Sequence, residues 1–478
     1  MSLVLLFYSI VYKRNTLRSI YLFFISLFFY YKSGGFFFSL LIISTLTDYC
    51  LAWFIYKSDK RLVRKAYVAI SLIVNLGILA YFKYSYFIID SLNQFSDSSF
   101  EAQNILAAWS NRFLGSNFDV STIILPIGIS FYTFQTISYT IDVYRNKLKP
   151  VKNIFDFGFY VSFFPQLVAG PIVRAAQFIP QIYAKYRLSK LEMSHALFLI
   201  VSGLIKKILI SDTISIHFVD RVFDDPLAFS GFENLAALYG YALQIYCDFS
   251  GYTDMAIGIA LLMGFRLPVN FYSPYKARNL TDFWRRWHIS LSSWLRDYLY
   301  IPLGGSRKGK FRGHLNVFIT MLLGGLWHGA NLRFVLWGGL HGLGLIFTKI
   351  WSGLRRSKKE PGKFSRLISI FITFHFVVFL WLFFRSDSLN SALHMMQQIM
   401  YHFDPRMIPA VLMAYKYVFL LIAAGFIIHW LPSGVKEWYR AKFILSPLWI
   451  KAFAIVILIF LLYQVKSTEL QPFIYFRF

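Results

Sequence analysis

The sequence of 478 residues is 57% apolar and 20% aromatic, and only 15% of its residues are charged. Soluble domains carry roughly 45–50% apolar and about 25% charged residues, so this composition excludes an ordinary soluble enzyme, a disordered chain and a secreted disulfide scaffold. The 49 basic and 23 acidic residues give a net charge of +26. Because the basic residues gather in short loops between apolar runs, we attribute the surplus to cytoplasmic loops and not to nucleic-acid binding. The composition predicts an all-α polytopic protein embedded in membrane lipid.

The first part of the chain alternates apolar runs with loops of opposite charge. Apolar runs at residues 20–31 and 36–56 lead to loop 57–65, which holds five basic residues and one acidic residue and is predicted to be cytoplasmic. A span at residues 66–89 follows. Segment 90–119 then holds four acidic residues and one arginine, so we place it on the extracytoplasmic side.

The rest of the chain continues this alternation. Residues 158–172 are apolar but are broken by Pro165, Gly170 and Pro171. We predict a re-entrant segment there, which requires protein or water around its backbone. The basic loop 355–366 is predicted to be cytoplasmic. The other predicted spans are residues 121–144, 195–219, 235–263, 315–331, 334–351, 367–384, 417–431 and 448–463, so the total is about eleven crossings. No internal repeat or long linker is evident, and residues 1–478 are predicted to form a single integral-membrane domain.

Two segments concentrate polar side chains in apolar surroundings: residues 279–297, which hold His288, and residues 324–331, which hold His328. An ionised side chain at the bilayer centre costs about 2.5–3.5 kcal/mol, so such residues usually face a cavity or a partner. If a helix begins near His314, a rise of about 1.5 Å per residue places His328 roughly 21 Å from the cytoplasmic end. This depth is past the midplane of a hydrocarbon core of about 30 Å.

His328 is a candidate general base. Three glycines surround it, which allows a close ligand, and burial favours the neutral imidazole, whose lone pair can accept a hydroxyl proton. Two other interpretations stay open. A histidine in an apolar run is often only a hydrogen-bond partner between helices, and His288, beside Arg285 and Arg286, could be solvated on an interfacial helix.

Two carboxylates and two lysines also lie in predicted spans. Asp248 and Asp254 could line a tunnel, or they could pair with a buried basic residue. Lys206 and Lys207, which disagree with the charge pattern of the loops, could contact donor phosphates, snorkel towards the membrane surface or pair within the bundle. Cys50 and Cys247 have no metal-type spacing, so no metal site is predicted.

Several motifs resemble the membrane-bound O-acyltransferase superfamily. The two most specific are Asp282-Phe-Trp-Arg-Arg-Trp-His-Ile-Ser-Leu-Ser292 and Gly325-Leu-Trp-His-Gly-Ala330. Others are similar to its alginate O-acetyltransferase branch, so that the resemblance covers nearly the whole chain: Pro126-Ile-Gly-Ile-Ser-Phe-Tyr-Thr-Phe-Gln135, Phe163-Phe-Pro-Gln-Leu-Val-Ala-Gly-Pro171, Tyr246-Cys-Asp-Phe-Ser-Gly-Tyr-Thr-Asp254, Arg296-Asp-Tyr-Leu-Tyr-Ile-Pro-Leu-Gly-Gly305 and Pro472-Phe-Ile-Tyr-Phe-Arg-Phe478.

The resemblance implies a helical bundle with a central funnel or tunnel. It implies His328 as the principal active-site residue and His288 as the second, with a tunnel lining that we assign to Asp248, Asp254, Trp327 and Asn331. No bound cofactor is implied. Acetyl-CoA is the expected ultimate acyl donor, on the cytoplasmic side.

The implied function is transfer of acetyl groups across a bacterial inner membrane to an extracytoplasmic polysaccharide, with the help of a partner acetyltransferase. The acceptor could be an alginate-like exopolysaccharide, cellulose or peptidoglycan. Two alternatives from other classes stay open. One is D-alanyl transfer to teichoic acid, which the motifs fit less well, and the other is a transporter or scaffold, for which the paired repeats of many transporters are not evident.

Overall fold

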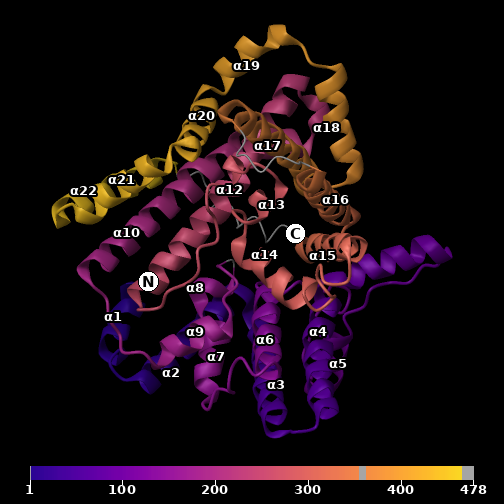
Figure 1. Ribbon diagram of the computed structural model, residues 1–478, viewed down its shortest axis with the longest axis vertical. Coiled ribbons are helices and arrows are strands. Elements are labelled where there is room, and N and C mark those ends of the chain that lie inside the picture. Colours follow the sequence, from indigo (N-terminus) through magenta and orange to yellow (C-terminus); the bar gives the residue numbers. More distant parts are fainter. Residues whose placement is uncertain (1, 169, 355–361, 466–478) are drawn as a thin grey trace. The chain divides into compact units, whose positions relative to one another are not determined.

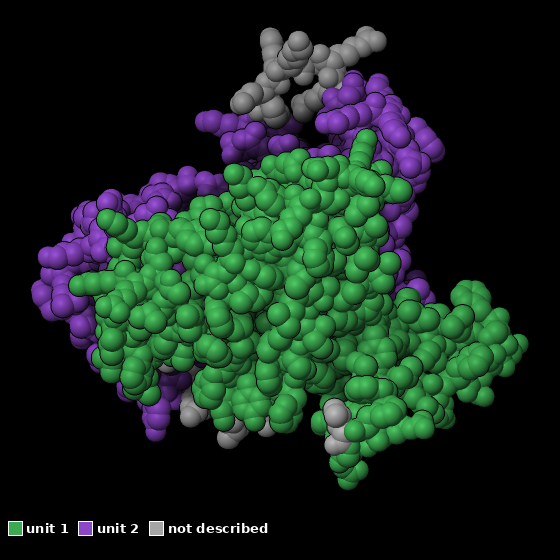
Figure 2. Space-filling view, turned by 90° about the horizontal axis from the view of Figure 1, so that it is seen from below, with its two compact units in different colours: residues 1–168, 172–186 green, residues 169–171, 187–478 purple. Residues whose placement is uncertain are grey.

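The computed structural model describes residues 2–168, 170–354 and 362–465. Every regular element in these ranges is a helix, which confirms the all-α prediction. The chain separates into two compact units, residues 1–168 with 172–186 and residues 169–171 with 187–478 (Figure 2). That residues 1–478 form one domain stays a prediction. Residues 355–361 of the predicted cytoplasmic loop and the closing motif 472–478 lie outside the described residues.

Unit 1 carries the first nine α-helices and one short 3-10 helix of the described chain (Figure 1). They are α1 (Ser2–Val11), α2 (Asn15–Gly34), η1 (Gly35–Phe37), α3 (Phe38–Lys57), α4 (Arg61–Ser96), α5 (Ile105–Leu114), α6 (Ile129–Tyr144), α7 (Ile154–Ser162), α8 (Phe164–Leu167) and α9 (Ala175–Tyr183).

A buried carboxylate ties three helices of unit 1 together. Asp48 of α3 is fully buried and accepts hydrogen bonds from Ser71 and Asn75 of α4 and from Thr140 of α6. The Asn75 Nδ2–Asp48 Oδ2 and Thr140 Oγ1–Asp48 Oδ1 distances are both 2.6 Å. Because both carboxylate oxygens have donors, the network compensates the cost of burying this group.

The segment predicted to be re-entrant is a pair of short helices, α7 and α8, which is broken at Phe163. Residues 156–168 are all buried within the protein. The irregular backbone at the break between these helices therefore has the protein cover that such a segment requires.

Unit 2 carries the remaining helices of the described chain (Figure 1). They are α10 (Lys190–Leu204), the π-helices η2 (Ile205–Asp212) and η3 (Ser215–Val219), α11 (Asp220–Asp224), η4 (Pro226–Ala228), α12 (Gly231–Leu262), η5 (Pro274–Lys276), α13 (Leu280–Trp284), α14 (Ile289–Leu295), the π-helix η6 (Arg296–Tyr300), α15 (Lys310–His328), α16 (Leu332–Leu354), α17 (Lys363–Arg385), α18 (Leu389–Tyr401), η7 (Pro405–Met407), α19 (Ile408–Ala414), α20 (Lys416–Trp430), α21 (Ser433–Leu445) and α22 (Leu448–Val465).

The two longest helical segments of unit 2 pack side by side along α10 and α12 (Figure 1). Each begins with a capping box, Ser189 with Glu192 for α10 and Ser230 with Glu233 for α12, which satisfies backbone N–H groups of the first turn. The backbones meet where Gly203 faces Gly251, and a Cβ at either position would overlap the carbonyl oxygen of the other. Small residues at helix interfaces allow this close approach.

Helices α15 and α16 form a second close pair. A Cβ on Gly325 of α15 would overlap the Phe334 carbonyl, and a Cβ on Gly338 of α16 would overlap the Met321 carbonyl. The glycines therefore permit direct backbone packing, which brings the end of α15 against the first turns of α16. This end of α15 carries His328.

By length and composition, five helical segments of the described chain could cross a membrane: Asn15–Lys57, Arg61–Ser96, Lys190–Asp224, Leu332–Leu354 and Lys363–Arg385. Two bent pairs, Pro405–Ala414 with Lys416–Trp430 and Ser433–Leu445 with Leu448–Gln464, raise the number to seven. The predicted eleven crossings are not confirmed. Residues 20–31 and 36–56 were expected to be separate spans but lie in one continuous helical segment. The predicted span 121–144 contains only the 16-residue helix α6.

Candidate active site

His328 is the last residue of α15 and is 4% exposed. Within the described part of the chain, three aromatic rings lie near its imidazole, with centroid distances of 5.0 Å to Trp327, 5.2 Å to Trp337 and 5.3 Å to Phe384. Gly329 follows in extended conformation and ends the helix. A Cβ on Gly329 would overlap the Phe334 ring, so only glycine allows this ring to pack against the backbone that follows His328.

His288 is fully buried, and this burial excludes the solvated interfacial position that the neighbouring arginines had left open. It precedes α14 with φ of 42°, a left-handed conformation that is uncommon for a residue with a side chain. Asn270 holds this turn, because its Oδ1 lies 3.2 Å from His288 Nδ1 and also accepts hydrogen bonds from the backbone N–H and the hydroxyl of Ser290. Since Oδ1 acts as an acceptor, Nδ1 of His288 carries the proton and donates.

The two histidines, 40 positions apart in sequence, meet at one tryptophan. The Trp327 ring lies 6.3 Å from the His288 ring and 5.0 Å from the His328 ring, and it is 5% exposed. The sequence did not settle whether these histidines are close in space. The structure brings both of them, with Trp327, into one buried aromatic cluster.

The other three residues assigned to a tunnel lining have different surroundings. Asp248 and Asp254 of α12 pair with lysines, at 2.5 Å for Lys207 Nζ–Asp248 Oδ1 and 2.6 Å for Lys206 Nζ–Asp254 Oδ2. The paired interpretation of these carboxylates is therefore correct, and it explains why two lysines interrupt an apolar run. Asn331 is exposed, and its Oδ1 accepts the Arg333 N–H at the start of α16.

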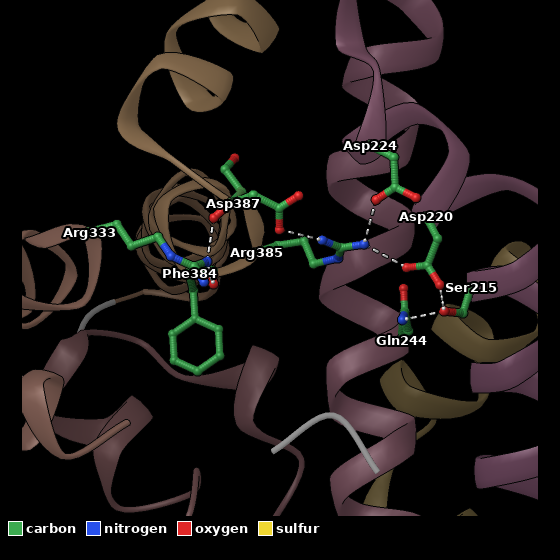
Figure 3. A network of polar contacts seen from close by, with 9 residues as sticks. Ser215, Asp220, Asp224, Gln244, Arg333, Phe384, Arg385 and Asp387 are labelled. Carbon is green, nitrogen blue, oxygen red and sulfur yellow. Dashed lines mark hydrogen bonds and ion pairs between the residues drawn. The ribbon is translucent and has the colours of Figure 1, made fainter. Parts of the chain in front are cut away.

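Two arginines, Arg333 and Arg385, fix the end of α17 (Figure 3). Arg333 donates to the Phe384 carbonyl at 2.9 Å and also to the Ser386 carbonyl. Arg385 pairs with Asp220 of α11 at 2.8 Å and lies 3.4 Å from Asp224 and 3.7 Å from Asp387. These contacts hold the backbone of Phe384, whose ring lies against His328.

Two adjoining pockets open next to this cluster. The first, of about 490 Å³, is lined by Arg278, Arg285, Arg286 and Lys349, together with Asn279, Thr281, Asp282, Thr348 and Ser352. The second, of about 360 Å³, shares Thr281, Arg285 and Lys349 with the first and is otherwise mostly apolar. Its lining includes Ile289, which follows His288 in the chain, and Trp284, whose ring lies 5.8 Å from Trp337. The first pocket, a basic mouth, therefore adjoins an apolar pocket, and two lining residues of that pocket neighbour His288 in the chain or Trp337 in space.

A third, apolar groove of about 650 Å³ lies between α17 and α20, is lined by residues such as Phe371 and Trp430, and carries no such charges. Among the described residues, no group of three or more His, Cys, Asp or Glu side chains could hold a metal ion.

Sequence reasoning missed several residues that position the site. Asn270, which anchors His288, is a single asparagine in a loop and gives no periodic signal. Trp337 and Phe384 were counted only as apolar residues of predicted spans. Trp337 could have been singled out, because it shares one face of α16 with His341 at a spacing of four residues.

A comparison with family models places this site in a known family. The model of the membrane-bound O-acyltransferase family, MBOAT, matches residues 142–392, which include both histidines and more than half of the chain. The chain belongs to the membrane-bound O-acyltransferase family. As an MBOAT chain with several apolar helices, it is a multi-pass membrane protein.

Curated relatives agree with this family. A probable alginate O-acetylase, AlgI, of Pseudomonas putida is 44% identical over 326 residues, which are 67% of this MBOAT chain and 62% of that protein. A peptidoglycan O-acetyltransferase of Helicobacter pylori is 35% identical over 417 residues, covering 81% and 74% of the two chains. A teichoic acid D-alanyltransferase of Bacillus subtilis is 29% identical over 271 residues, covering 53% and 67%. The MBOAT chain spans about three fifths of the length of the alginate O-acetylases that it matches, 62% and 59% for two of them.

Proposed function

We propose that this chain is a membrane O-acetyltransferase that moves acetyl groups from acetyl-CoA on the cytoplasmic side towards an extracytoplasmic polysaccharide. The observation that carries the proposal is the buried cluster of His288, Trp327 and His328, together with the basic mouth and the apolar pocket that lie near it. Relatives named as alginate and peptidoglycan O-acetyltransferases support this class of reaction.

In the proposed step, the oxygen of an acceptor hydroxyl attacks the carbonyl carbon of the acetyl thioester. His328 takes the hydroxyl proton as the new C–O bond forms. The C–S bond then breaks, and the leaving thiolate recovers the proton from His328, so that the products are an acetyl ester and a thiol. General base catalysis of this kind contributes typically 10²–10⁴-fold to rate.

His288 has a different role in this proposal. Because its Nδ1 donates to Asn270, the neutral ring offers a lone pair at Nε2, which can accept a hydrogen bond from the acceptor hydroxyl. A hydroxyl oriented in this way spends less time in unreactive positions, and correct orientation is worth several kcal/mol of the barrier. Asn270 is the positioning residue that keeps the ring in place.

The donor side of the proposal rests on charge. Arg286 is paired with Asp282 at 2.8 Å, whereas Arg278, Arg285 and Lys349 line the same pocket with no carboxylate partner among the described residues. Guanidinium and ammonium groups of this kind suit phosphate groups, so the nucleotide part of acetyl-CoA fits the basic mouth. The apolar pocket beyond it then takes the acyl-carrying arm.

The acceptor side of the proposal includes a partner. An extracytoplasmic acetyltransferase would receive the acetyl group, or the chain would pass it directly to the polymer. Alginate-like exopolysaccharide, cellulose and peptidoglycan all offer the required hydroxyl. The bacterial inner membrane is the proposed location, because it separates cytoplasmic acetyl-CoA from such polymers.

Inverted inner-membrane vesicles of a polymer-producing strain test the proposal, since their cytoplasmic face is outermost. We expect acetyl label from externally added acetyl-CoA to appear as O-acetyl esters in the enclosed polymer, and only when the chain is present. Lys349→Ala should raise the apparent KM for acetyl-CoA a few-fold, more strongly at low salt, because phosphate attraction is screened by salt.

Two results would contradict the proposal. Transfer that proceeds equally in vesicles without the chain would remove its enzymatic role. Transfer of D-alanine from a carrier, with no transfer of acetyl groups, would favour the teichoic acid alternative.

A further inference from the structure

A third buried histidine lies outside the pair described above. His341 of α16 is fully buried, and neither of its ring nitrogens has a hydrogen-bond partner among the described residues. Its ring lies 4.6 Å from Trp337 and 5.1 Å from Trp284 and is stacked 6.0 Å from Phe283. The large majority of buried side-chain polar atoms in native proteins are hydrogen-bonded, so this side chain requires a specific explanation.

The two tryptophans that contact His341 share this property. The indole Nε1 atoms of Trp284 and Trp337 are buried and also lack partners within the described part of the chain. Three side chains in mutual ring contact therefore have buried polar atoms with no hydrogen-bond partner among the described residues. One of them, Trp284, also lines the apolar pocket of about 360 Å³. The cluster therefore adjoins the proposed donor path, by which we mean the basic mouth and the apolar pocket together.

The cluster occupies the middle of a stripe along one face of α16. Lys349, Leu345, His341 and Trp337 follow one another at spacings of four residues, which places them on the same side of the helix. Lys349 lines the basic mouth, Leu345 lines the apolar pocket, and Trp337 contacts His328. At about 1.5 Å per residue the stripe is roughly 18 Å long, and it runs from the mouth to the histidine.

We propose that His341 recognises an amide of the pantetheine arm of the acyl donor, an inference that rests on the proposed function. A neutral imidazole offers one N–H donor and one acceptor, and an amide offers the complementary pair. A thioester alone offers acceptors only. The chemistry of His341 therefore selects an amide-bearing thioester such as acetyl-pantetheine or acetyl-CoA over an amide-free one, and His341 acts as a donor-binding residue.

Two thioesters test the inference: acetyl-pantetheine, which carries amides, and S-hexyl thioacetate, which does not. Transfer to polymer is measured in inverted vesicles with the wild type and with His341→Phe, which keeps an aromatic ring but removes both polar nitrogens. We expect kcat/KM for acetyl-pantetheine to fall at least about tenfold, which corresponds to the loss of one buried hydrogen bond, while the value for S-hexyl thioacetate changes less than about twofold. His341→Gln, which keeps a donor and an acceptor, should recover part of the loss.

A matched control is His375→Phe on α17. His375 already has a backbone partner, the Phe371 carbonyl oxygen at 2.8 Å from Nδ1. His375→Phe should therefore leave kcat/KM for both thioesters unchanged. An equal loss with both thioesters in His341→Phe, or no loss with either, would overturn the amide assignment. A wild-type protein that transfers from neither acetyl-pantetheine nor acetyl-CoA would instead contradict the proposed function itself.

Discussion

Two buried polar clusters in this protein differ in how their hydrogen bonds are satisfied. In unit 1, Asp48 receives donors from Ser71, Asn75 and Thr140, and both of its carboxylate oxygens are used. In unit 2, His341, Trp284 and Trp337 lie in mutual ring contact, yet their ring nitrogens have no partners among the described residues.

This difference distinguishes buried polar groups that stabilise the fold from buried polar groups that serve function. A fully satisfied network compensates its own burial and links helices, so it needs nothing from outside the protein. A buried polar group without a partner costs stability, so a native protein that retains one needs a reason for it, and here we propose that a ligand supplies the partner. By this criterion the Asp48 network supports the fold, whereas the histidine and tryptophan cluster belongs to the proposed donor path.

The largest expected effect comes from His328→Ala. Loss of the proposed general base should lower polymer O-acetylation by about 10²–10⁴-fold, while the protein still inserts and accumulates. The measurement is the O-acetate content of polymer from a deletion strain complemented at matched protein level. Near-normal acetylation would show that His328 serves packing and not catalysis.

Asp48→Ala tests the satisfied side of the comparison. Each buried donor left without its acceptor costs about 1–3 kcal/mol, so the loss of three hydrogen bonds should destabilise the fold by about 3 kcal/mol or more. Thermal unfolding in detergent measures this. Asp48→Asn, which keeps one acceptor oxygen, should lose less stability. An unfolding midpoint of Asp48→Ala equal to that of the wild type would show that the network does not stabilise the fold.

Asn270→Ala should have an intermediate effect on transfer. Without the acceptor for Nδ1, the His288 ring is no longer held, and misplaced catalytic groups cost up to about 100-fold in rate. We expect a loss of about 10- to 100-fold in kcat with little change in the KM for acetyl-CoA. Asn270→Asp keeps an acceptor oxygen and should restore much of the rate. An unchanged kcat in Asn270→Ala would show that His288 needs no positioning.

Asp387→Ala should have the smallest effect. Its carboxylate is 74% exposed and lies 3.7 Å from Arg385, which keeps the closer and less exposed Asp220. Exposed ion pairs of this kind contribute less than about 1 kcal/mol. Unfolding midpoints of Asp387→Ala and the wild type should therefore agree closely. A large fall in the midpoint would mean that Arg385 depends on Asp387 more than the contacts in Figure 3 indicate.

The sequence predicted the all-α class and the family, because apolar composition, charged loops and two specific motifs are all local signals. His328 could be singled out for the same reason, since glycines surround it in the chain itself. The number of membrane crossings could not be predicted reliably, because a short polar interruption such as residues 32–35 reads as a loop although the helical segment continues through it.

The meeting of His288 with His328 could not be predicted, because it depends on packing at Trp327 and not on spacing along the chain. The role of Asn270 could not be predicted for a similar reason, since its contact with His288 joins two irregular segments. The pairing of Asp248 and Asp254 with adjacent lysines was one of two open interpretations, and only the packing of η2 on α12 decides between them.

The most direct test of the central claim measures stability and transfer on the same purified samples of His328→Ala and Asp48→Ala. We predict that His328→Ala loses at least about 100-fold in transfer with an unfolding midpoint close to that of the wild type. Asp48→Ala should instead lower the midpoint, while each folded molecule transfers acetyl groups at the wild-type rate. Retained transfer in His328→Ala at normal stability would contradict the account.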